Sequence, residues 1–226
     1  VHPGGDAGPQ FRPGQGATTL FSERDGQPVC YTRDLRGEAT AARAVISQCP
    51  ALDGDDDWRW QLDDLEQALS TLEQLHDLGD AVVLDWPQGK RVELSTEARV
   101  SQIGCCLILT RVWLAIDGGL TLDDGRVMAM RELLDLTATA RGRFVRLGED
   151  DYLILSNALR RRLDKLRSVA DDGRFHPLAA PVIDEIIDGM TVETDHAWQA
   201  LLDQLAAMQS LEPTLPSTLQ AELRDY

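Results

Sequence analysis

The sequence has few cysteines and no long apolar run, and each shortage excludes a class of protein. Its longest apolar run, residues 103–109, has the length of a strand, whereas a membrane-spanning helix needs about 20 apolar residues. The cysteines form no Cys-x-x-Cys pair and have no histidine at metal-ligand spacing, so no zinc site is predicted. They are Cys30, Cys49, Cys105 and Cys106. We expect free thiols in a reducing compartment, which indicates a cytoplasmic protein that does not enter a membrane.

The sequence motifs of common enzymes are missing as well. There is no glycine-rich phosphate loop, no dinucleotide fingerprint and no acidic box after a buried strand, so both halves of a nucleotide hydrolase site are absent. The serine nucleophile elbow and the His-Glu-x-x-His zinc motif are absent too. The histidines are His2, His76, His176 and His196, none within five residues of another. The sequence therefore predicts no catalytic, cofactor-binding or metal-ligating residue in this chain.

Charge is the most uneven property of the sequence. The net charge of −16 argues against a surface that coats itself with nucleic acid. However, residues 126–174 hold 11 Lys and Arg against 8 Asp and Glu, a net charge of +3. The remainder holds 11 basic against 30 acidic residues, a net charge of −19. One mildly basic segment therefore lies inside an acidic protein.

Hydrophobic periodicity and turn signals predict an α+β fold, with an antiparallel β meander flanked by helices and a mostly helical C-terminal part. Asp-Gly pairs mark hairpin turns within residues 24–27 and 122–126. The meander is predicted from β-rich runs at residues 81–86, 91–94, 101–110, 112–122 and 127–130. Leucines at helical spacing predict a helix over residues 63–78, with Asp63 as its cap, and another after Ser156.

Composition also suggests how the chain is organised. The opening residues are rich in Gly and Pro and include neither an initiator Met nor a signal-like stretch, so we expect a linker inside a longer protein. The predicted segments are a flexible linker at 1–16, a hairpin–helix unit at 17–57, an α+β domain with an antiparallel sheet at 58–155, and a helical part at 156–226.

A run of basic residues on the predicted helix 156–170 is the feature best able to contact an anion. The candidate nucleic-acid-binding residues are Arg160, Arg161, Lys165 and Arg167, with Arg143 and Arg146 extending the surface. Two interpretations stay open. The cations form a solvated face paired with acidic residues at 149–151, 164 and 171–172, or they contact the phosphates of duplex DNA.

Several stretches together resemble the region just before the motor of bacterial SNF2-family helicases. They are LGDAVVLDWPQGK (78–90), WLAI (113–116), LDDGRV (122–127), RELL (131–134), GRFVRL (142–147), LEP (211–213) and LQAELRDY (219–226). The last resembles the Leu-Arg-x-Tyr-Gln entry to the first RecA-like lobe. The resemblance covers roughly residues 60–226 and lacks the zinc ligands that some relatives carry upstream. Residues 1–57 match nothing in that family.

The resemblance implies a non-catalytic accessory region of an ATP-dependent DNA translocase or helicase. In that family, the glutamine that reads adenine and the phosphate loop would follow Tyr226, so ATP and Mg²⁺ belong to the motor rather than to these residues. We expect the region to pack on the ATPase core of the same chain and to guide duplex DNA or gate ATP hydrolysis. The alternative is an acidic protein–protein interaction module that recruits a partner.

Overall fold

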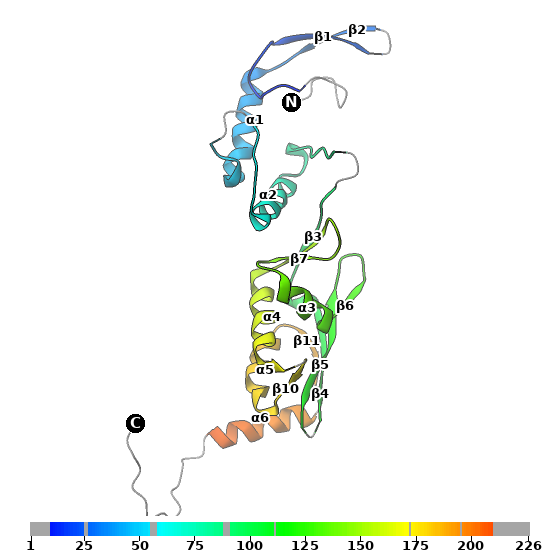
Figure 1. Cartoon of the computed structure of the whole chain (residues 1–226), viewed down its shortest axis with the longest axis vertical. Coiled ribbons are helices and arrows are strands. Elements are labelled where there is room, and N and C mark those ends of the chain that lie inside the picture. The colour runs from blue at the N-terminus through cyan, green and yellow to red at the C-terminus, as the bar shows by residue number, and fades with distance from the viewer. Residues whose placement is uncertain are drawn as a thin grey trace, which may run out of the picture. The chain divides into compact units, whose positions relative to one another are not determined.

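The computed structural model describes residues 10–24, 27–54, 58–87, 91–110, 112–171, 173–194 and 196–209. The chain divides into two compact units, Val1–Arg91 and Val92–Tyr226, here called unit 1 and unit 2 (Figure 1). Helices and strands occur in both units, so the predicted α+β class is confirmed. The four segments predicted from composition stay a prediction.

Unit 1 begins with an antiparallel hairpin and continues into two helices. Its elements are β1 (Thr19–Arg24), β2 (Gln27–Thr32), α1 (Leu35–Gln48), the 3₁₀ turn η1 (Pro50–Leu52), α2 (Leu65–Asp77) and the 3₁₀ turn η2 (Gly79–Ala81). The predicted hairpin is confirmed, although its Asp-Gly turn lies outside the described residues. The predicted helix over 63–78 is α2, whose cap is Asp64 rather than Asp63, because Asp64 Oδ1 accepts the Glu66 amide at 2.8 Å.

A single arginine ties the segment before the hairpin to α1. The buried Arg33 guanidinium donates to Glu38 from Nε to Oε1 at 2.9 Å and from Nη2 to Oε2 at 2.5 Å. It also donates to three main-chain carbonyl oxygens, those of Arg12 at 3.3 Å, Gln15 at 2.9 Å and Ala17 at 3.3 Å. The amide of Gly14 donates to the Glu38 carboxylate at 3.2 Å. The last residues of the predicted linker are therefore hydrogen-bonded to unit 1.

The strand predicted over residues 81–86 does not form. The side chains alternate between half-buried Val82, Leu84 and Trp86 and exposed Val83 and Asp85, as in a strand. No described segment pairs with this backbone in a sheet. The half-buried side chains line a cavity of about 350 Å³ beside the end of α2. The sequence pattern was that of a strand, but a strand also needs a neighbour to accept its hydrogen bonds.

Unit 2 contains the larger part of the sheet structure and the core. Its strands are β3 (Glu93–Ala98), β4 (Ile103–Leu109), β5 (Leu114–Thr121), β6 (Val127–Ala129), β7 (Phe144–Arg146), β8 (Asp151–Leu155), β9 (Ala170–Asp171), β10 (Arg174–Phe175) and β11 (Thr191–Glu193). Its helices are α3 (Met130–Thr139), α4 (Asn157–Val169), α5 (Ala180–Ile187) and α6 (His196–Gln209), with 3₁₀ turns η3 (Val100–Gln102) and η4 (Pro177–Ala179).

The predicted antiparallel meander is confirmed only in part: β4, β5 and β6 form consecutive antiparallel pairs, but unit 2 also contains two parallel strand pairs. One sheet has the order β11-β4-β5-β10-β9, with β6 also paired to β5, and the other has the order β3-β8-β7. The pairs β11–β4 and β3–β8 are parallel. Parallel neighbours require a long crossover, and here the crossovers contain α3, α4 and α5. Strands β9, β10 and β11 also interrupt the C-terminal part, which was predicted to be mostly helical.

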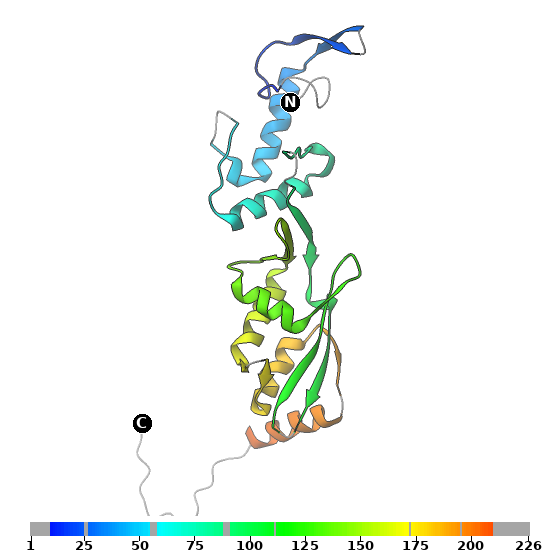
Figure 2. The ribbon, with the colours of Figure 1, turned by 45° about the vertical axis from the view of Figure 1, so that its right-hand side comes forward.

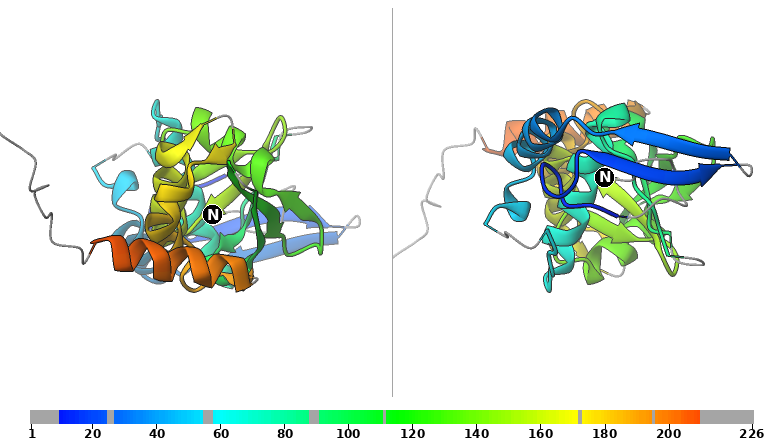
Figure 3. Two further views of the ribbon diagram at one scale, coloured as in Figure 1. Left: turned by 90° about the horizontal axis from the view of Figure 1, so that it is seen from below. Right: turned by 90° about the horizontal axis from the view of Figure 1, so that it is seen from above.

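The core of unit 2 lies between one face of the β4–β5 sheet and the helices. Figure 2 shows α3, α4 and α5 on one side of β4 and β5, and Figure 3 shows α6 crossing the end of this helical layer. Leu159, Leu163 and Leu166 place a fully buried stripe of α4 in that core. Burying each such leucine contributes about 1.5–3 kcal/mol. This stripe fixes which face of α4 remains outside.

Candidate functional site

The basic helix predicted from the sequence is α4, and its cap and its leucine stripe determine how it presents its cations. The Ser156 hydroxyl accepts the Leu159 amide at 3.2 Å, which begins the helix. The buried leucines recur at spacings of four and three, so the side chains between them emerge on the remaining faces. Arg160 and Arg167 flank the stripe on the side of α3, and Arg162 and Lys165 on the side of α5.

On the side of α3, the cations are held by a carboxylate of the same helix. Arg160 Nε donates to Asp164 Oδ2 at 3.1 Å, and Arg167 Nη2 lies 3.5 Å from Asp164 Oδ1. Arg160 Nη2 also donates to the Ala140 carbonyl oxygen, at the end of α3, at 3.0 Å. Only 15% of the Arg160 side chain is exposed. Arg160 therefore joins α3 to α4 and is poorly placed to contact a ligand.

On the side of α5, the cations are engaged as well. Lys165 Nζ donates to Glu185 Oε1 at 3.0 Å. Arg162 Nη1 donates to the Ile186 carbonyl oxygen at 2.8 Å and to that of Asp188. These carbonyls lie at the C-terminal end of α5, where the last turn leaves acceptors without partners in the helix. Arg162 thus completes the end of a neighbouring helix.

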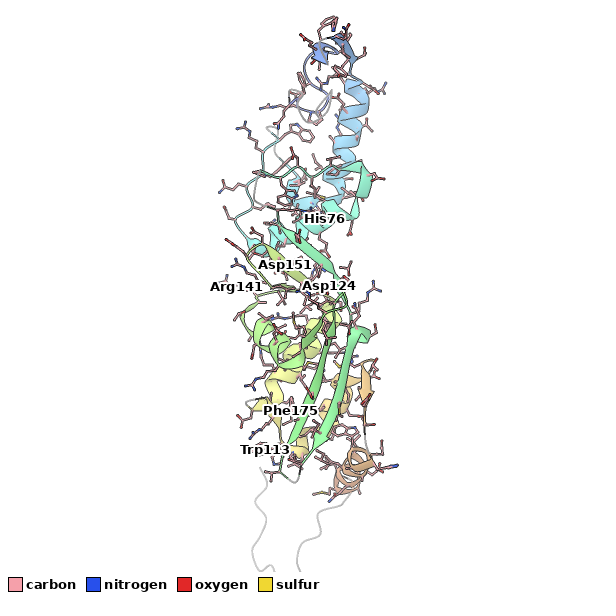
Figure 4. The ribbon with its side chains drawn as sticks, turned by 90° about the vertical axis from the view of Figure 1, so that its right-hand side faces the viewer. His76, Trp113, Asp124, Arg141, Asp151 and Phe175 are labelled. Atoms are coloured by element: carbon pink, nitrogen blue, oxygen red, sulfur yellow. The ribbon has the colours of Figure 1, made fainter. Side chains whose placement is uncertain are left out.

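Arg161 is the α4 cation that faces away from the core. It is exposed and forms no ion pair within the part of the chain that the structure describes. Arg141 is also exposed, in the loop that follows α3 (Figure 4). Because Arg160 bonds to Ala140, this loop lies next to the first turns of α4. Arg161 and Arg141 are therefore the cations best placed to meet an external anion on this side of unit 2.

The two residues predicted to extend the basic surface have local partners. Arg143 Nη1 lies 3.5 Å from Glu97 Oε1, and its guanidinium carbon lies 4.9 Å from the centre of the Phe144 ring. Arg146 donates to the carbonyl oxygens of Gly148 and Glu149, each at 2.7 Å. Arg146 therefore closes the turn between β7 and β8.

A second cluster of arginines surrounds a cavity of about 600 Å³ that the sequence did not indicate. Its lining includes Arg131 of α3, Arg167 of α4 and Arg174 of β10, together with Asp117 and Asp135. Arg131 and Arg174 belong to the basic segment 126–174, so the excess of positive charge in that segment was the one feature of the sequence that could have indicated this cluster. Their proximity follows from the packing of three separate elements, which sequence spacing does not report.

Within the described ranges, no group of three or more His, Cys, Asp or Glu side chains is placed to hold a metal ion. All four cysteines are free thiols. Burial raises the pKa of the Cys105 thiol to about 11, so it stays protonated and unreactive near neutral pH.

Comparison of the chain with protein-family models, with curated proteins and with solved structures found no match. Among the helices in the described ranges, none combines the length and the apolar character needed to cross a membrane.

Proposed function

We propose that this chain is a non-catalytic accessory region of a bacterial SNF2-type ATP-dependent DNA translocase or helicase. It would pack on the ATPase core and guide duplex DNA or gate ATP hydrolysis. The observation that carries the DNA contact is the exposed pair Arg161 and Arg141 beside a helix whose other cations are already engaged. The sequence resemblance supplies the motor, and the shortage of catalytic motifs supports an accessory role. ATP and Mg²⁺ would be bound by the motor.

Fewer residues take part in the proposed DNA contact than the basic sequence of α4 suggested. An arginine that bonds to two partners, as Arg160 and Arg162 do, must give up at least one of them before it can bind a phosphate. Arg160 and Arg162 are therefore structural residues in this proposal, and Lys165 forms an exposed ion pair with Glu185 that competes with a phosphate contact. Two to three phosphate contacts would give weak, strongly salt-dependent binding, which suits a surface that steers DNA toward a motor.

The test is a titration of fluorescently labelled duplex DNA with the 226-residue chain at several salt concentrations. Replacing both Arg161 and Arg141 by alanine should weaken binding and reduce the slope of log K against log salt by about 2, since each phosphate contact contributes about 0.9. Arg126→Ala is the matched control, because Arg126 is exposed and pairs with Asp124 in the β5–β6 turn. An unchanged slope in the double variant would contradict the DNA contact. In the longer protein, the same variant should lower DNA-stimulated ATP hydrolysis.

One observation favours the alternative of an acidic interaction module. Residues 175–209, which contain α5, β11 and α6, include six Asp and Glu and no Lys or Arg. A negatively charged surface attracts a basic partner and repels DNA. No binding of duplex DNA at low salt, combined with binding of a basic protein that weakens as salt is added, would favour this function over the first.

A further inference from the structure

The outer edge of β5 has a gap between two partner strands. On that edge, β6 pairs with residues 119–121 and β10 pairs with residues 114–115. Residues 116–118 pair with β4 on the other side but have no partner strand in the gap within the described ranges. The cavity of about 600 Å³ opens here, bounded by α3 on the side of β6 and by the end of α4 and β10 on the other side. This volume lies within the range of small-molecule sites, about 300–1,000 Å³.

The cavity has a basic rim. Arg131, Arg167 and Arg174 line it from three different elements. Strand register places Arg174 beside Ala115, which is itself part of the lining, so its position follows from the sheet. Each guanidinium has five N–H donors in a planar fork that suits phosphate oxygens. Arg167 meets Asp164 through Nη2 alone, at 3.5 Å, so the N–H groups on its other nitrogens can donate to a ligand.

The floor of the cavity is apolar. The half-buried side chains of Ile116 and Leu134 contribute to it, whereas Phe175, which also lines the cavity, is almost completely buried and belongs to the core beside it (Figure 4). A flat, weakly polar group can lie against such a surface and be removed from water. The carboxylates of Asp117 and Asp135 border the same space. They accept hydrogen bonds, which suits hydroxyl or amino groups on the ligand.

From this combination we infer that the cavity binds a nucleotide. The phosphate would meet the arginine rim, the base would lie on the apolar floor, and the carboxylates would accept hydrogen bonds from ribose hydroxyls or an exocyclic amino group. The ligand is either a free mononucleotide or the terminal nucleotide of a single strand, which share this chemistry. The site goes beyond the proposed function, because it uses neither Arg161 nor Arg141 and requires no duplex.

The experiment is isothermal titration calorimetry of the 226-residue chain with AMP, GMP, CMP and UMP, and with inorganic phosphate. We expect at least one nucleotide to bind, and inorganic phosphate to bind at least about tenfold more weakly, because it makes no contact with the floor. Competition by a 5′-phosphorylated single strand would identify strand ends as the source, and its absence would identify free nucleotides. Either result supports the site. The inference is overturned if no nucleotide binds, or if phosphate binds as tightly as the nucleotides.

Two variants locate the ligand. Arg174→Ala removes one guanidinium of the rim and should weaken binding about tenfold or more. Ala138→Trp fills the cavity from the exposed face of α3 while leaving every charge in place, and should abolish binding. Arg126→Ala is again the control. Unchanged affinity in both cavity variants, with wild-type circular dichroism, would overturn the assignment. The Arg161 and Arg141 double variant should bind nucleotide normally, so failure of either proposal can be recognised separately.

Discussion

Arg33 joins several segments of unit 1 through one buried side chain. Its side chain is 2% exposed and that of Glu38 is 14% exposed, so the two charges meet almost out of water. The guanidinium carbon also lies 4.5 Å from the centre of the Phe11 ring. Surface ion pairs contribute about 0–1 kcal/mol, whereas removing one partner of a buried pair costs about 3–5 kcal/mol. Because both side chains are so little exposed, the ion pair of Arg33 and Glu38 belongs with the buried pairs.

We therefore expect Arg33→Ala to lower the free energy of unfolding of unit 1 by about 3–5 kcal/mol, because the Glu38 carboxylate loses its partner. Arg33→Lys keeps the charge but loses the two-pronged contact, and should cost about 1–3 kcal/mol. Replacing both residues, Arg33→Met with Glu38→Leu, should cost less than Arg33→Ala alone, since no buried charge is left unpaired.

Hydrogen exchange measured by mass spectrometry can test this series, because it reports each unit separately. Amides in β1, β2 and α1 should lose protection in Arg33→Ala, and amides in β4 and β5 of unit 2 should serve as the internal reference. A loss of less than about 1 kcal/mol in unit 1 would refute the reasoning and would place the pair among surface ion pairs. A double variant less stable than Arg33→Ala would refute the argument from unpaired charge.

Three further predictions concern pH, backbone packing and thiol reactivity. Hydrogen bonding from Arg33 lowers the pKa of Glu38 below 4.5, so the stability that the ion pair contributes is complete above that value and is lost as pH falls through the lowered pKa. Thermal melts measured from neutral pH down through the acid range should show this loss in the wild type and not in the Arg33→Ala variant. Gly118→Ala should lower the free energy of unfolding of unit 2, measured in urea, by about 2–5 kcal/mol, because the new Cβ would lie 2.1 Å from the Gly104 carbonyl oxygen and the backbone φ is +136°. Gly104→Ala is the control and should lower it much less, since no atom lies within 4 Å of the Cβ that it adds. Equal losses in the two variants would contradict this prediction. A thiol reagent at neutral pH should label exposed Cys30 and leave buried Cys105 unmodified until the chain unfolds, as peptide mass analysis can show.

The local elements of this protein could largely be predicted from the sequence. The hairpin of β1 and β2 follows from alternating residues around Asp-Gly, and α4 follows from Ser156 and the leucines at 159, 163 and 166. Both depend on neighbours within a few residues. Local pattern was not sufficient for the segment 81–86. Its apolar and polar side chains alternate as in a strand, but it has no partner strand in the described part of the chain.

The candidate sites show the same limit. The sequence indicated the sign of the charge on α4 and the residues that carry it. It did not indicate that Arg160 would bond to the end of α3, or that Lys165 would meet Glu185 on α5. A pairing between side chains on different elements depends on how those elements pack, and periodicity within one helix carries no information about that.

By itself, the sequence determined the α+β class, the hairpin, the capped basic helix and the shortage of catalytic motifs, because these depend on residue type and local spacing. Only the tertiary structure decided the parallel strand pairs, the gap along β5 and the cavity lined by Arg131, Arg167 and Arg174. It also decided which cations are already engaged and which, such as Arg161, remain exposed. Those features depend on contacts between residues far apart in the chain, and such contacts are fixed by burial of the shared core.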